Sequence, residues 1–247
     1  MRCTTVIIAA GCQPPESGIR SQTPPRAGDG SLPGRMEIGR SVEGRPIECV
    51  VIGHGPDTVH IIASIHGDEP AGTPLVEKLI THLDGAPELA EGRRIVVVPN
   101  ANPDGMAAGL RHNVRGVDLN RNFPASNYNR SQPHGNRPLS EPESRALNEL
   151  FRRYPPDRVV SIHQPRSLPP CVDYDGPGEA LAVAMSRVCD LPMKKLGSRP
   201  GSMGSYVGLS LGVPIITVEI PRFAEDGDGD VLWQRYGRML LAAIEFR

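Results

Sequence analysis

The residues best suited to metal chemistry follow two apolar runs of the chain. His66 and Glu69 belong to the sequence His-Gly-Asp-Glu directly after the run VHIIASI at 59–65, and His163 closes the run RVVSI at 158–162. An imidazole and a carboxylate three residues apart can turn toward one cation, and a distant histidine can supply a third ligand, leaving one position of a catalytic zinc ion open. The alternative is that Asp68 or Glu69 stabilises the positive end of the helix that follows.

A single acid lies inside another apolar run. Glu219 occurs within VPIITVEI at 213–220, where the neighbouring side chains predict a buried strand. Burying a carboxylate is unfavourable unless it is paired or takes part in chemistry. Desolvation raises the pKa of such a group toward neutrality, which suits a general base that later acts as an acid. The alternative is an ion pair with a nearby arginine such as Arg222.

A polar segment at 111–124 concentrates arginine and asparagine. It contains Arg111, Arg115 and Arg121, with Asn120 and Asn122 on either side of the last. Guanidinium groups bind carboxylates through two hydrogen bonds and can stabilise an oxyanion. A charged segment is ordinarily a solvated loop, but amides next to Arg121 favour a site for a substrate carboxylate.

The elements that would position these residues alternate between strands and helices. Apolar and β-branched runs predict strands at 47–52, 59–65, 94–99, 158–162 and 213–220, and helical spacing predicts helices at 70–83, 140–154 and 231–246. For the second helix we expect Ser140 as the N-cap and Glu143 as its capping-box partner. The alternation predicts one three-layer α/β/α domain with a mixed, mainly parallel central sheet. Ligands then bind beyond the carboxyl ends of the strands.

Composition excludes several classes of protein. The 247 residues carry 27 Lys and Arg against 28 Asp and Glu, which argues against a nucleic-acid partner. No run of 18 apolar residues predicts a transmembrane helix. Five cysteines are too few for a disulfide scaffold and match no zinc-finger spacing.

The first 34 residues differ from the rest of the chain. Residues 1–12, MRCTTVIIAAGC, resemble a bacterial lipoprotein signal in which Cys12 would be lipidated, and residues 13–34 are a linker rich in Pro, Gly and Ser. This reading predicts a folded domain at 35–247 in the cell envelope or periplasm, anchored through Cys12. The alternatives are a buried first strand or a wrongly assigned start, and a disordered extension on a cytoplasmic enzyme.

Several motifs together resemble the zinc carboxypeptidase family. They occur in the family's order over the 35–247 region: HGDE at 66–69, RHN at 111–113, VDLNRNF at 117–123, IH at 162–163 and VE at 218–219. The resemblance implies that His66, Glu69 and His163 bind Zn²⁺. It also implies that Glu219 is the base that activates water on the metal, and that Arg111 polarises the scissile carbonyl.

The resemblance is strongest to a bacterial amidase branch of that family. It implies a murein peptide as the substrate, cut between γ-D-glutamate and meso-diaminopimelate, with Asn120 and Arg121 binding the carboxylate next to the cut bond. Two departures affect this expectation: the stretch 193–200 lacks the mobile tyrosine of the digestive enzymes, and His163 is followed by Gln-Pro-Arg and a longer loop. The second departure bears on the preference for diaminopimelate.

Two other functions are compatible with parts of this pattern. One is a zinc-dependent deacylase of the succinylglutamate desuccinylase and aspartoacylase type, against which the sequences NRNF at 120–123 and GSMGSY at 201–206 argue. The other is a non-catalytic peptide-binding lipoprotein. Whether Cys171 and Cys189 form a disulfide in an exported protein stays open. The oligomeric state stays open.

Overall fold

The computed structural model describes residues 34–223 and 227–247. The expected signal at 1–12, and with it the lipid anchor and the envelope location, lies outside these residues, as does the expected linker apart from Gly34. Among the described helices, none has both the length and the apolar character needed to cross a bilayer.

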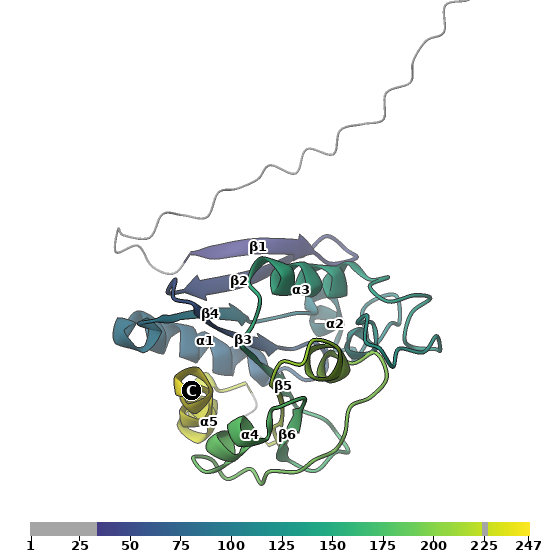
Figure 1. Ribbon diagram of the computed structural model, residues 1–247. Helices are drawn as coiled ribbons and strands as arrows, with labels where there is room; N and C mark the ends of the chain where they lie inside the picture. The colour runs from purple at the N-terminus through teal and green to yellow at the C-terminus, as the bar shows by residue number, and fades with distance from the viewer. Residues whose placement is uncertain (1–33, 224–226) are drawn as a thin grey trace, which may run out of the picture. The chain divides into compact units, whose positions relative to one another are not determined.

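A seven-stranded mixed sheet forms the centre of the domain. Its strands are β1 (Arg35–Arg40), β2 (Pro46–Ile52), β3 (Asp57–Ala63), β4 (Arg93–Val98), β5 (Arg158–His163), β6 (Cys171–Asp175) and β7 (Ile215–Glu219). Their order is β1-β2-β4-β3-β5-β7-β6, which Figure 1 shows from β1 at the top to β6 at the bottom. The four central strands β4, β3, β5 and β7 run parallel, and the pairs β1·β2, β2·β4 and β6·β7 are antiparallel.

Helices cover both faces of this sheet. They are α1 (Gly72–Asp84), α2 (Pro103–Ala108), α3 (Pro142–Arg153), α4 (Glu179–Ser186) and α5 (Gly229–Glu245), with short 3₁₀ turns η1 (Pro87–Ala90) and η2 (Leu119–Arg121) and a π-helical turn η3 (Gly204–Ser210). One apolar cluster joins the sheet to α1, α4 and α5, and a second joins it to α3 and η3. The domain therefore has the three layers and the mixed sheet expected from the sequence.

The local sequence accounts for these layers. Successive side chains of a strand point to opposite faces, so Ile61 packs into the first cluster and its neighbour Ile62 into the second. Because both faces of the parallel strands are covered, they are continuous apolar runs. In α1, Leu75, Leu79 and Leu83 recur every four residues and all three are buried.

The start of α3 differs from the prediction. The N-cap residue is Glu141, not Ser140, and it makes no capping hydrogen bond with its side chain. Asn122 binds the start of the helix from another segment: its Oδ1 accepts hydrogen bonds from the backbone N–H of the N-cap residue Glu141 and from the Ser144 hydroxyl. Glu143 is buried and accepts the backbone N–H of Val42. A contact distant in sequence thus replaces the local capping box.

A buried histidine of β3 makes stability depend on pH. His60 lies against Phe151 and its Nε2 donates to the Tyr154 carbonyl at 2.7 Å. Burial lowers its pKa to about 4, against the opposite effect of that hydrogen bond. In the unfolded state the pKa of a histidine is about 6.5, so acidification from pH 7 to pH 5 protonates the unfolded state but not the buried His60. The free energy of unfolding therefore falls by about 2 kcal/mol through His60 over this range.

Urea unfolding at both pH values measures this loss. The loss on acidification should be about 2 kcal/mol smaller in His60→Asn than in the wild type, whereas His54→Asn, at an exposed position, should leave it unchanged. Equal losses in all three proteins would contradict a neutral buried His60.

Candidate metal centre and active site

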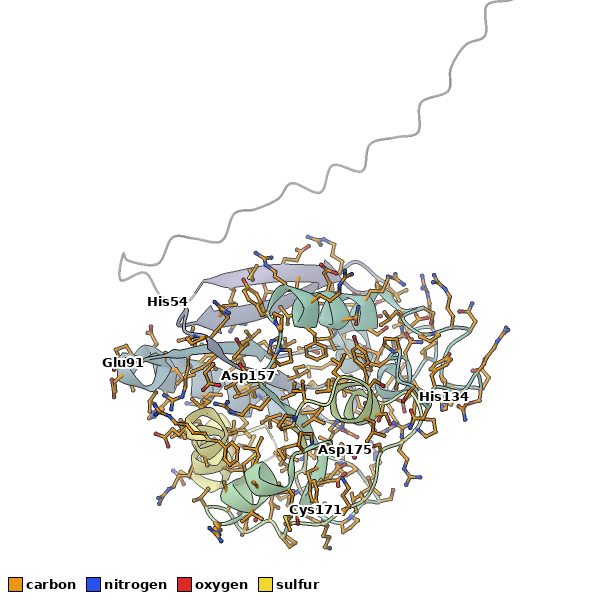
Figure 2. All side chains as sticks on the ribbon, in the orientation of Figure 1. His54, Glu91, His134, Asp157, Cys171 and Asp175 are labelled. Atoms are coloured by element: carbon orange, nitrogen blue, oxygen red, sulfur yellow. The ribbon has the colours of Figure 1, made fainter. Side chains whose placement is uncertain are left out.

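The candidate site lies where three adjacent parallel strands end. His163 is the last residue of β5 and pairs in register with Glu219, the last residue of β7. His66 and Glu69 follow β3, the neighbour of β5 on its other side. In Figure 2, Glu91, which precedes β4, and His134, in the loop after η2, lie at opposite sides of the domain.

Three side-chain atoms converge at this edge. The Nδ1 atoms of His66 and His163 are 3.2 Å apart, and Glu69 Oε2 lies 3.0 Å from the first and 2.9 Å from the second. All three side chains are at most 4% exposed. The residues named from the sequence as ligands are thus brought together, and neither Asp68 nor Glu69 caps α1, which has no side-chain cap.

The donor set fits a zinc ion. Two imidazole nitrogens and one carboxylate oxygen are ligands that zinc accepts at about 2.0–2.2 Å in tetrahedral geometry, which separates ligand atoms by roughly 3.3 Å. The observed separations of 2.9–3.2 Å are close to that value. Buried acids also surround the imidazoles: although burial opposes the charged form of His66, Glu69 and Asp118 raise its pKa to about 9. The centre therefore favours a bound positive charge.

A further partner orients each imidazole from behind. His66 Nε2 lies 3.1 Å from Asp118 Oδ1, and His163 Nε2 lies 3.0 Å from Ser161 Oγ. Such partners fix the ring orientation and the tautomer that presents the other nitrogen to a metal. In both residues the Nδ1 atom is the one left facing the centre.

Glu219 lies beside the three candidate ligands and is not one of them. Its side chain is buried, and within the described residues its Oε2 has no hydrogen-bond partner. Burial raises its pKa, as do the negative charges of Glu69 and Asp173, while His163 and His66 act in the opposite direction. The alternative pairing with Arg222 is wrong, because that guanidinium donates to the Asp68 carbonyl at 2.6 Å. A buried carboxylate oxygen left free at a metal centre can accept a proton.

Arg111 contacts the acids of the centre and is partly exposed. Its Nη1 donates to Glu69 Oε1 at 2.9 Å and its Nη2 to Asp118 Oδ2 at 3.4 Å. Its backbone carbonyl accepts the Gly67 N–H, which ties the segment to the loop between the first two ligands. With 38% of its side chain exposed, the guanidinium can also reach a bound molecule.

Asn120 and Arg121 belong to the turn η2, next to Asp118. Asn120 Oδ1 accepts the backbone N–H of Met203 at 2.8 Å, and Asn120's own N–H donates to Asp118 Oδ1. Arg121 is partly buried and donates to the Asn120 carbonyl at 2.5 Å. Burial lowers the pKa of Arg121, and the Asp118 carboxylate partly offsets this. The turn thus couples both residues to the carboxylate that orients His66.

The family assignment follows from this geometry and from comparison with known proteins. The model of the zinc carboxypeptidase family matches residues 31–168, more than half of the chain, including the segments of His66, Glu69, Arg111 and Arg121. This chain belongs to the zinc carboxypeptidase family. As a member of it, the protein is a hydrolase.

Individual relatives agree with the assignment. Murein peptide amidase A of Escherichia coli (strain K12) is 36% identical over 224 residues, which cover 83% of this chain and 88% of that protein. The crystal structure of murein-tripeptide amidase from Escherichia coli O157 matches with a TM-score of 0.66 and 32% identity, over 84% of this chain and 92% of that one. Carboxypeptidase A from Helicoverpa armigera, at 19% identity, has a TM-score of 0.71 over 85% of this chain and 66% of its own, a likeness of fold alone.

Two contacts of the site were not anticipated. Asp118 contacts His66 from a distant segment, although it stands in the same motif as Asn120 and Arg121, whereas Ser161 lies two residues before His163 on the same strand. The sequence left open whether Cys171 and Cys189 pair, and in the structure both are free thiols. Cys171, labelled in Figure 2, lies on β6 next to Val172, which packs in the same cluster as Cys189. Because adjacent strand residues face opposite ways, Cys171 points to the other face of the sheet.

Removing the charge behind His66 should weaken metal binding. In Asp118→Asn the ring keeps a hydrogen-bond acceptor but loses the negative charge that raises its basicity, so zinc affinity should fall by about 10–100-fold. Competition against a fluorescent chelator measures this, with Asp173→Asn as a control that removes a buried carboxylate which does not contact the histidines. Equal zinc affinity in Asp118→Asn and the wild type would contradict the orienting role.

Proposed function

We propose that this protein is a zinc-dependent amidase that cuts the γ-D-glutamyl–meso-diaminopimelate bond of murein peptides. The observation that carries the metal chemistry is the convergence of His66, Glu69 and His163 beside Glu219, whose Oε2 has no hydrogen-bond partner in the part of the chain that the structure describes. The murein peptide as substrate is inferred from similarity to murein peptide amidase A over most of both chains.

In this proposal His66, Glu69 and His163 hold the ion. Zinc, when bound, acts as a Lewis acid that polarises the amide carbonyl and lowers the pKa of water. Glu219 Oε2 accepts a proton from the attacking water and then delivers it to the nitrogen of the leaving amine, so the base is regenerated in each turnover. Its raised pKa suits both directions of transfer.

Arginines would bind the remaining charges of the reacting peptide. Arg111, beside Glu69 and partly exposed, would donate to the carbonyl oxygen as negative charge develops there. Asn120 and Arg121 would bind the free carboxylate next to the cut bond, which restricts cleavage to the end of a peptide. The rigid attachment of η2 to Met203 favours such positioning.

Hydrolysis of L-Ala-γ-D-Glu-meso-diaminopimelate by the purified full chain tests the proposal. We expect release of free diaminopimelate that stops on chelation and returns when zinc is added. N-succinylglutamate and N-acetylaspartate are assayed in parallel. Hydrolysis of these instead of the tripeptide would overturn the proposal in favour of a deacylase, and bound zinc without any hydrolysis would favour a binding protein.

A further inference from the structure

The loop before η3 packs directly against the turn that carries Asn120 and Arg121. The Phe123 N–H donates to the Gly201 carbonyl at 2.9 Å, and the Met203 N–H donates to Asn120 Oδ1 at 2.8 Å. Gly201 has φ +70°, and a Cβ there would lie 2.3 Å from the Arg121 carbonyl oxygen. The loop therefore has one position relative to Arg121, which only glycine permits.

Arg199 stands two residues before this contact, on a fixed backbone. Its carbonyl accepts the Ser202 N–H at 3.0 Å and the Ser205 hydroxyl at 2.7 Å. Its side chain is exposed, and in the described part of the chain its guanidinium makes no ion pair or hydrogen bond. A cation held by a rigid loop and left without an acid is available to a ligand.

The charges around Arg121 are unbalanced. Burial lowers the pKa of Arg121, and the positive charges of both Arg111 and Arg199 lower it further, which places three guanidinium groups in one neighbourhood. The acids that contact Arg111, Glu69 and Asp118, already face the two histidines. One substrate carboxylate bound by Arg121 would not neutralise Arg199 as well.

We propose that Arg199 is a specificity-determining residue that binds a second carboxylate on the leaving amino acid. This rests on the proposed function and deepens it: the enzyme would select a dicarboxylic leaving residue. In meso-diaminopimelate the far end of the side chain carries a carboxylate. Lysine has the same side chain as far as the carbon that bears the amine but lacks that carboxylate.

Two tripeptides that differ only in this carboxylate test the proposal. We compare kcat/KM for L-Ala-γ-D-Glu-meso-diaminopimelate and L-Ala-γ-D-Glu-L-Lys. A hydrogen-bonded ion pair of about 1.5–3 kcal/mol predicts a preference for diaminopimelate of roughly 10–100-fold, which Arg199→Ala should abolish. Arg121 would bind the carboxylate common to both peptides, so Arg121→Ala should lower kcat/KM for both and keep the ratio of the two within about threefold.

Lys194→Ala is the matched control, since it removes an exposed cation of the same loop and should leave the ratio unchanged. Equilibrium binding of free meso-diaminopimelate and free L-lysine, measured by calorimetry, gives a second readout in which Arg199→Ala should again abolish the preference. If the wild type cuts both peptides and Arg199→Ala lowers kcat/KM for both equally, or for neither, the role of Arg199 is refuted and the proposed function stands. If the wild type cuts neither peptide, the proposed function itself is refuted.

Discussion

Replacing Glu219 with glutamine is expected to lower kcat by about 10²–10⁴-fold without loss of zinc. The amide keeps the size of the side chain but cannot accept the proton of the attacking water. Glu219 is adjacent to the three candidate ligands and is not one of them, so the metal centre should persist. Steady-state kinetics on the murein tripeptide and metal analysis of the same samples give both values.

Asp173→Asn is the matched control for Glu219→Gln. Asp173 is a buried carboxylate on β6, paired in register with Thr217 of the strand that carries Glu219, and its Oδ1 accepts the Leu196 N–H. The asparagine keeps an acceptor, so turnover should stay within about tenfold of the wild type. Near-wild-type turnover in Glu219→Gln would exclude Glu219 as the base.

The second large effect is expected at Arg111. Arg111→Met should lower kcat by about 10²–10³-fold, because a donor to the developing oxyanion is lost while the apolar part of the side chain is kept. KM should change much less, since the free carboxylate of the substrate would still meet Asn120 and Arg121. The measurement is kcat and KM together with the zinc content per chain.

The zinc content separates two roles of this residue. Arg111 also donates to Glu69, so its removal could act through the metal ligand. Retained zinc with a low kcat supports a direct role at the substrate. Loss of zinc in parallel with activity would contradict that role and make Arg111 a positioning residue for Glu69.

The sequence predicted the parts of the site that lie on strongly patterned elements. His163 and Glu219 end apolar parallel strands, and such strands must end at one edge of a sheet. The central strands and the helices α1, α3 and α5 were also predicted close to their observed positions, because apolar runs and helical spacing mark them in the sequence. His66 and Glu69 were expected at the same edge of the sheet. They lie there in the loop after β3, because that strand ends at Ala63.

The unpredicted features depend on contacts between distant segments. The strands β1 and β6 lie at the edges of the sheet and contain charged residues, so they lack a clear apolar pattern. Asn122 binds the N-cap residue of α3 from another segment of the chain. The position of Arg199 follows from the approach of Gly201 to Arg121, which no local spacing indicates.

Titration of the metal-free full chain with zinc tests the central claim most directly. The rate of diaminopimelate release from the murein tripeptide is measured after each addition. One centre formed by His66, Glu69 and His163 predicts a rate that rises in proportion to zinc and reaches its plateau at one zinc ion per chain. A rate independent of zinc, or a plateau at that stoichiometry that persists in His163→Ala, would contradict the account.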